Sequence, residues 1–207
     1  MNPDGDSSAD RTSLELPYSF AWRHTWCKIS PGLEHLLLGE GSADGVVLAF
    51  DEKHGPFRLT YRLRWNAAWR IQEARLQSRT QSATHTMHLY SDGHGQWTDN
   101  DGRGLADLDG CTVIDIWPTP FTNTFPIRRM RSENGKSERF QVAWVRGPEL
   151  SVQSQTQTYT VLGNGLYLFE SPGDEAIFRA KLTVDDDGIV LYYPELFQRI
   201  EFRHAGE

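Results

Sequence analysis

The sequence predicts an all-β protein: a single antiparallel sheet of about 10–12 strands, rolled into a half-open barrel with little helix. Short segments in which apolar and polar residues alternate recur at close spacing along the 207 residues. Turn signals, among them Asn134-Gly135 and Asn164-Gly165, separate these segments. No segment keeps a helical period for more than a turn or two. We expect one domain, residues 16–207, after a disordered leader, residues 1–15, which is polar and acidic.

Six strands, and one short strand between turns, are expected in the first half of the chain. They are Tyr18–Thr25, Leu33–Leu38, Val46–Phe50, Phe57–Trp65, Trp69–Thr80, His85–Ser91 and a short strand within Gly95–Thr98. A glycine-rich hairpin loop, Gly39–Gly45, joins the second strand to the third. In Phe57–Trp65 the alternation is most regular, with aromatic and aliphatic residues on one face and Arg58, Arg62 and Arg64 on the other. The arginine face is either solvated and paired with carboxylates such as Glu73, or a positively charged ligand contact.

The second half of the chain continues the pattern. Its expected strands are Cys111–Trp117, Phe140–Val145, Ser151–Leu162, Leu166–Glu170, Ala176–Val184 and Ile189–Tyr193. Residues 196–200 are expected to form a closing turn or short helix. Ser151–Leu162 is polar on both faces, with glutamines alternating against serine and threonine, which predicts a sheet edge or a strand that faces water in a cavity.

A long irregular segment, Pro118–Arg129, follows the strand that contains Asp115. Three prolines each remove a backbone donor, so regular sheet is excluded. We expect the segment to lie across one mouth of the barrel, where short polar side chains bond its unpaired backbone groups. Helical periodicity is judged to be excluded so close after Pro126, so the side chains of Arg128 and Arg129 should diverge. One of them is expected to pair with Asp115 and the other to contact ligand.

Composition and motifs exclude several functions. A net charge of −7 argues against binding to nucleic acid and against adsorption to anionic lipid surfaces. The sequence has neither a signal peptide nor an apolar run long enough to span a membrane, so we expect a cytoplasmic protein in which Cys27 and Cys111 are free thiols. His85 and His88 would point to opposite faces of a strand. We expect no metal and no cofactor.

The central segment also carries a resemblance. Leu108-Asp-Gly-Cys111, Asp115 and Thr119-Pro-Phe-Thr-Asn-Thr-Phe-Pro-Ile-Arg-Arg129 resemble the signature of a bacterial family called putative glycolipid-binding. Pro148–Val152 and Gly188–Phe197 are similar to the C-terminal half of that family. The resemblance covers about nine tenths of the chain. It implies a rolled, mostly antiparallel sheet like that of bacterial lipoprotein carriers, with an apolar cavity.

We therefore expect non-catalytic binding of an amphipathic small molecule, such as a lipid or glycolipid, in that cavity. Candidate ligand contacts are Tyr61, Arg62, Trp65, Trp69, Asp115, Thr119, Thr122, Asn123, Arg128 and Arg129. Two alternatives stay open at this point. One is an enzyme that uses Asp115 as a cavity carboxylate on a small apolar substrate. The other is an interaction protein, including a homodimer, that pairs through an edge strand at Ser151–Leu162.

Overall fold

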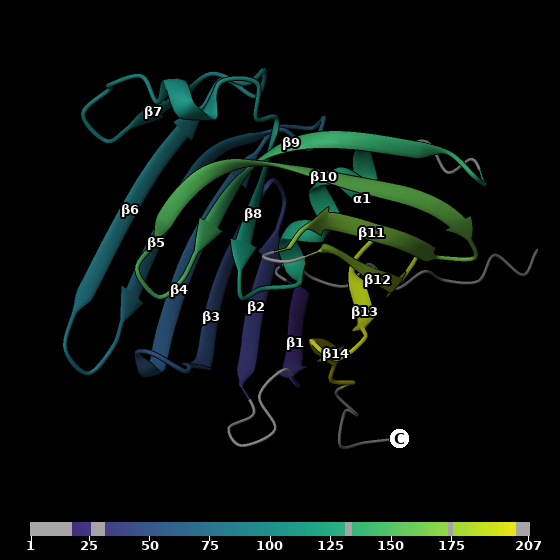
Figure 1. The fold of residues 1–207 in the computed structure, drawn as a ribbon, viewed down its shortest axis with the longest axis horizontal. Helices are drawn as coiled ribbons and strands as arrows, with labels where there is room; N and C mark the ends of the chain where they lie inside the picture. The colour runs from purple at the N-terminus through teal and green to yellow at the C-terminus, as the bar shows by residue number, and fades with distance from the viewer. Residues whose placement is uncertain (1–17, 26–31, 131–133, 174–175, 202–207) are drawn as a thin grey trace, which may run out of the picture.

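A computed structural model describes residues 18–25, 32–130, 134–173 and 176–201. Its strands form one 14-stranded sheet in the order β7-β6-β5-β4-β3-β2-β1-β14-β13-β12-β11-β10-β9-β8 (Figure 1). The predicted all-β rolled sheet is confirmed, with more strands than expected. Neighbouring strands are antiparallel except β8 and β9, which are parallel because the long irregular segment lies between them.

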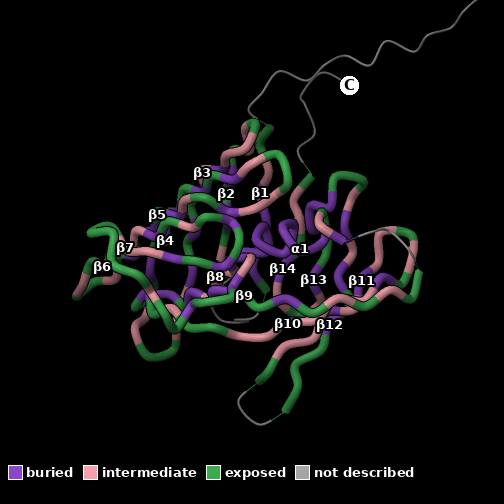
Figure 2. The backbone as a smooth tube through the Cα atoms, turned by 90° about the horizontal axis from the view of Figure 1, so that it is seen from above, coloured by how far each residue is buried: buried purple, intermediate pink, exposed green. Residues whose placement is uncertain are grey.

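The N-terminal half of the sheet contains β1 (Tyr18–His24), β2 (Leu33–Gly39), β3 (Ser42–Asp51), β4 (Gly55–Trp65), β5 (Ile71–Arg79), β6 (Thr84–Ser91) and β7 (Trp97–Asp99). The C-terminal half contains β8 (Val113–Trp117), β9 (Ser137–Arg146), β10 (Ser151–Gly163), β11 (Leu166–Pro172), β12 (Ile177–Val184), β13 (Val190–Tyr193) and β14 (Phe197–Arg199). Three short helical elements are η1 (Ala106–Leu108), η2 (Phe121–Asn123) and α1 (Thr124–Arg129). The two halves join where β1 pairs with β14, and they curl toward each other (Figure 2).

The concave face of the sheet carries the core. On β4 the expected inward residues Phe57, Leu59, Tyr61, Leu63 and Trp65 are all buried. The inward position opposite Tyr61 is Gly45, and a Cβ placed there would lie only 2.1 Å from the tyrosine ring. The ring therefore packs directly on the backbone of β3, which explains why this strand has glycine in its interior.

The polar strand β10 is interior to the sheet, so its prediction as an edge was wrong. It pairs with β9 on one side and with β11 on the other. Its polar side chains also do not all face water, because Gln157 is 1% exposed and lies on the same face as buried Tyr159. The glutamine amide is tolerated there because it has hydrogen-bond partners.

Two connections also differ from expectation. β2 and β3 are joined by Glu40-Gly41 alone, and the rest of the predicted loop belongs to the strands. Gly41 has a φ of 64°, which a tight turn of this kind requires. Near the C-terminus, the residues expected to form a closing turn or helix instead supply β14.

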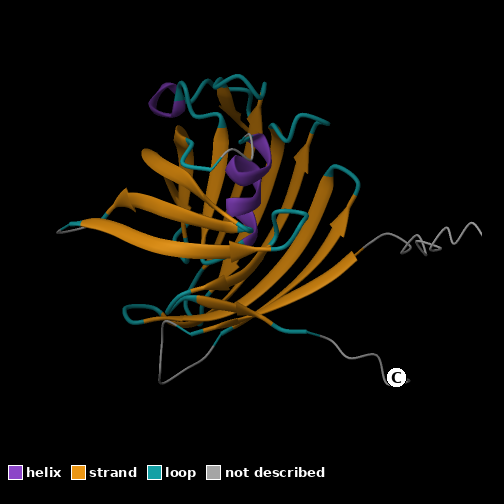
Figure 3. Ribbon diagram, turned by 90° about the vertical axis from the view of Figure 1, so that its right-hand side faces the viewer, coloured by secondary structure: helices purple, strands orange, loops and turns teal. Residues whose placement is uncertain are grey.

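Pro118–Arg129 does not lie across a mouth of the barrel. Its helical part, η2 and α1, sits inside the roll between the two halves of the sheet (Figure 3). Pro126 is the third residue of α1, in the first turn, where backbone N–H groups have no partner within the helix. The missing donor therefore costs nothing, and the expected exclusion of helix was wrong. Phe121 and Phe125 are fully buried, and both pack against Trp65.

Candidate functional site

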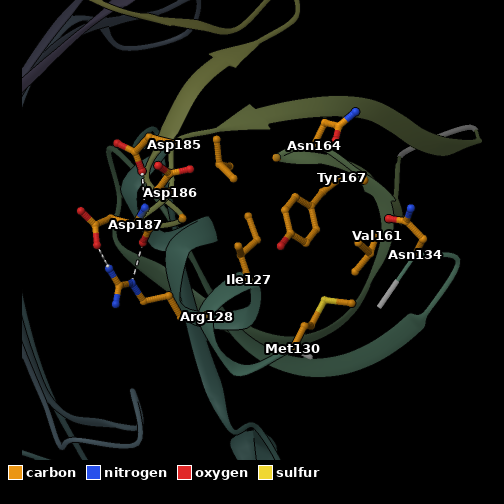
Figure 4. A pocket seen from close by; sticks show the side chains of 14 residues that line it. Ile127, Arg128, Met130, Asn134, Val161, Asn164, Tyr167, Asp185, Asp186 and Asp187 are labelled. Carbon is orange, nitrogen blue, oxygen red and sulfur yellow. Dashed lines mark hydrogen bonds and ion pairs between the residues drawn. The ribbon is translucent and has the colours of Figure 1, made fainter. Parts of the chain in front are cut away.

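A pocket of about 380 Å³ opens at one end of the roll, beside the C-terminus of α1 (Figure 4). We call it the end pocket. Its apolar lining comes from α1 and its C-cap, β10, β11 and β12: Ile127, Met130, Val161, Tyr167 and Val184. Its polar lining comes from the surrounding turns and from α1: Arg128, Asn134, Asn164, Asp185, Asp186 and Asp187. Figure 4 shows the aspartates with Arg128 on one flank of the pocket and the two asparagines on the other, with apolar side chains between them.

The turns that border the end pocket are specified by the sequence. Asn164 and Gly165 have φ of 52° and 69°, the conformation of the hairpin turn that Asn-Gly predicts. Gly188 has a φ of 75°, and a Cβ there would lie 3.2 Å from Ile127 Cγ2. Glycine at this position lets the β12–β13 turn approach α1 closely, which places the aspartates beside Arg128.

Arg128 is fixed at the rim of the end pocket. Its Nη2 lies 2.7 Å from Asp187 Oδ1, and its Nε donates to the Asp187 carbonyl. The guanidinium also lies over the ring of Trp69, 4.4 Å from its centroid. Figure 4 shows the arginine directed toward the aspartate-rich turn. Arg128 is therefore held by one turn and one aromatic ring at the edge of the hollow.

Arg129 points elsewhere. Its Nη1 donates to the Thr112 carbonyl over 2.8 Å, and its guanidinium lies 5.5 Å from the ring centre of Phe140. Burial lowers the pKa of Arg129 below its usual value, with the nearby charge of Arg70 acting in the same direction. The expected divergence of the two arginines is correct, although it arises from the rotation of successive residues around a helix.

Asp115 pairs with neither arginine, which corrects that prediction. Thr122 Oγ1 donates to its Oδ1 over 2.8 Å, and Gln157 Nε2 donates to its Oδ2 over 2.6 Å. Burial raises the pKa of Asp115, while the bonds from Gln157 and Thr122 act in the opposite direction. The carboxylate is thus held by neutral donors that tie the irregular segment to β10.

A second polar cluster lies around a carboxylate that the sequence analysis did not single out. Tyr61 and Thr119 donate to Glu34 Oε1 over 2.5 and 2.6 Å. Glu34 has no exposed surface. The burial of Tyr61, together with the charge of Glu34, raises the pKa of Tyr61 well above its usual value. Glu34 stands in the run Leu33–Leu38, which resembled a uniformly apolar strand. One sequence signal could have found it: Glu34 is two residues from inward-facing Leu36, so on a strand it lies on the same, inward face.

The other candidate contacts lie apart from the end pocket. Asn123 accepts a hydrogen bond from Tyr159 in the core, over 2.9 Å. Trp65 and Trp69 stack on each other, with ring centres 5.1 Å apart, beside α1. Arg62 lies on the outer face of the sheet and pairs with Asp44 at 2.7 Å, rather than with Glu73. Of the ten candidates, Arg128 alone lines this pocket.

The described part of the chain offers neither a metal site nor a membrane-spanning helix. In residues 18–25, 32–130, 134–173 and 176–201, no group of three or more His, Cys, Asp or Glu side chains could hold a metal ion. Within the same ranges, no helix has the length and apolar character needed to cross a membrane. Cys111 is free and buried, whereas Cys27 lies outside the described residues.

The fold and the pocket define a class of rolled β-sheet proteins with a helix inside the roll and a hollow at one end. The chain belongs to the family described as putative glycolipid-binding, whose model matches residues 19–199. It is also similar to the crystal structure of a DUF1089 family protein from Pseudomonas aeruginosa, with 42% identity and a TM-score of 0.78. That match covers 82% of this chain and 92% of the other. No curated protein matches.

Proposed function

We propose that this protein binds an amphipathic small molecule in the end pocket, without catalysing a reaction on it. The observation that carries the proposal is a lining that combines five apolar side chains with aspartates, asparagines and one arginine around them. The volume of about 380 Å³ also falls within the range of pockets that hold small ligands. An acyl or alkyl chain would pack against Met130, Val161 and Tyr167, and the headgroup would remain at the rim.

The rim supports a neutral, hydroxyl-rich headgroup. On the rim, Asp187 pairs with Arg128 and Asp185 with Arg199, so among the described residues Asp186 is the carboxylate left without a paired cation. An anionic phosphate would meet these carboxylates and be repelled. Sugar hydroxyls can instead donate to carboxylates and both donate to and accept from asparagine amides. A glycolipid therefore suits this rim better than a phospholipid, in agreement with the name of the family.

The test is a titration of protein from which bound lipid has been removed. A fluorescent acyl probe should bind saturably in the micromolar range, roughly −8 kcal/mol. Octyl glucoside, below its micellar concentration, should displace the probe more effectively than octyl phosphate. Absence of saturable probe binding to folded protein would contradict the proposal. Stronger displacement by octyl phosphate would contradict the assignment of the headgroup.

A matched pair of variants tests the location. Asn164→Gly removes the rim amide but keeps a residue that accepts its φ of 52°. Glu195→Gly makes the same kind of change at an exposed position with a φ of 64°, outside the lining of the end pocket. Octyl glucoside should bind several-fold more weakly to Asn164→Gly and unchanged to Glu195→Gly. Equal affinities in both variants would place the ligand elsewhere.

A further inference from the structure

The outer face of the N-terminal half carries an exposed aliphatic patch. Leu33 and Leu37 on β2 and Val46 and Leu48 on β3 are 44%, 39%, 36% and 52% exposed. They face away from the core because they alternate with buried inward residues such as Leu36. Large aliphatic side chains gathered on neighbouring strands are a feature of surfaces that contact a partner.

Arginines flank this patch in the same outward row of the sheet. The register places Leu33 opposite Leu48, Leu48 opposite Arg58, and Arg58 opposite Arg79. Arg23 lies opposite Leu33 at the other end of the row. Two like charges directly opposite each other destabilise a sheet. In the described residues neither Arg58 nor Arg79 has a carboxylate partner, so an external anion would relieve their repulsion.

A shallow groove continues the basic surface beside the patch. It has a volume of about 400 Å³, and its lining includes Leu37 together with Arg62, Arg64 and Arg75. The outward positions of β1–β5 hold six arginines and two carboxylates, although the whole chain has a net charge of −7. The six arginines are Arg23, Arg58, Arg62, Arg64, Arg75 and Arg79, and the carboxylates are Asp44 and Glu73. The net charge therefore does not describe this face.

We infer that this outer face docks on the surface of an anionic lipid bilayer. Aliphatic side chains between arginines match the boundary between acyl chains and phosphates. The exposed leucines would enter the acyl boundary, while Arg58 and Arg79 would donate to lipid phosphates and so lose their mutual repulsion. The expectation from net charge, that the protein avoids anionic surfaces, is replaced by an oriented contact through one face. This inference does not depend on occupancy of the end pocket.

The experiment is flotation of the full-length protein with lipid vesicles. Protein should float with vesicles of phosphatidylcholine and phosphatidylglycerol, and far less with phosphatidylcholine alone or at high salt. The double variant Arg58→Gln/Arg79→Gln should lower the partition coefficient by ~30-fold, since each arginine near an anionic surface contributes about fivefold. Matched controls are Arg139→Gln/Arg146→Gln, which remove two exposed arginines of β9 and should not change binding.

Leu48→Ser should also weaken flotation, while Ile177→Ser, at an exposed apolar residue of β12, should not. Failure to float with anionic vesicles, or equal losses in the arginine pair and its control, would overturn the inference. So would concentration-dependent dimerisation, measured by sedimentation, that the Arg58→Gln/Arg79→Gln substitutions abolish, because the patch would then bind a second copy. Octyl glucoside affinity is measured separately, so either proposal can fail alone.

Discussion

The side-chain amide of Gln157 donates to Asp115 Oδ2 over 2.6 Å and joins β10 to β8 across the inner face of the sheet. Thr122 occupies the other carboxylate oxygen, so a mid-strand aspartate among isoleucines is held by two neutral side-chain donors together with the backbone of Ile116. Tyr159 extends the same network by donating to Asn123, in the residues that lead into α1. This network fixes the irregular segment inside the roll and thereby sets the position of α1 beside the end pocket.

The raised pKa of Asp115 predicts a pH-dependent contribution to stability. Its cause is burial, which disfavours the charged form in the folded state. The contribution is fully present below the unfolded-state value, about 3.9, and is lost as pH rises through the raised folded-state pKa. Asp115→Asn removes this titration. The free energy of unfolding of the parent, relative to that of the variant, should therefore fall as pH rises from about 4 toward 7.

Urea unfolding of both proteins at a series of pH values measures that difference, and groups common to both cancel. A difference that grows with rising pH would mean that the ionised carboxylate is the form the fold favours.

Tyr61→Phe and Tyr159→Phe each delete one buried hydroxyl, and their costs should differ. Tyr61 donates to the carboxylate of Glu34, whereas Tyr159 donates to the neutral amide of Asn123. Hydrogen bonds to charged groups contribute about 1.5–3 kcal/mol, and neutral ones about 1 kcal/mol. Denaturant melts should show the larger loss for Tyr61→Phe. The reverse order would contradict the inference that the Glu34 carboxylate is the stronger of the two acceptors.

Arg128→Ala and Arg129→Ala should separate ligand binding from stability. Arg129 is partly buried, and its removal leaves the Thr112 carbonyl without that donor, at a cost of about 1–3 kcal/mol. Arg128 is more exposed, so loss of its ion pair and its contact with Trp69 should cost about 1 kcal/mol or less. Octyl glucoside should bind more weakly to Arg128→Ala than to the parent protein, and equally well to Arg129→Ala and the parent. The role given to Arg128 would be wrong if Arg129→Ala weakened octyl glucoside binding and Arg128→Ala left it unchanged.

The thiol of Cys111 should react slowly with alkylating reagents in the folded protein. It is fully buried, and burial raises its pKa, so little thiolate is available near neutral pH. Two thiols should titrate after unfolding without reductant, in keeping with the expectation that Cys27 and Cys111 are both reduced. A single rapid reaction of Cys111 in folded protein, identified by peptide mapping, would contradict the burial argument.

Most of the sheet could be predicted because alternation and turn chemistry are local signals. The inward face of β4 and the hairpin turn at Asn164-Gly165 followed directly from residue order. The interior position of β10 could not be predicted in this way, because the burial of Gln157 depends on Asp115, a partner 42 residues away in the chain. A polar strand is predicted to be exposed until the hydrogen-bond partners of its side chains are known.

The helix inside the roll was missed for a different reason. Pro126 breaks a helix only in its interior, and its position within the helix cannot be known before the first residue of α1 is fixed. The end pocket was missed as well, because it is assembled from α1 and turns that the fold alone brings together. Arg128 was found because the family motif contains it. Its partner Asp187 was not found, because neither residue order nor a motif connects the two residues.

The most direct test of the end pocket is photocrosslinking with an alkyl glucoside that carries a diazirine on its chain. After irradiation of lipid-stripped protein, peptide mass spectrometry identifies the labelled residues. The account predicts labels on Met130, Val161 and Tyr167, which excess octyl glucoside suppresses. Labels that avoid these residues and persist in the presence of excess octyl glucoside would contradict it.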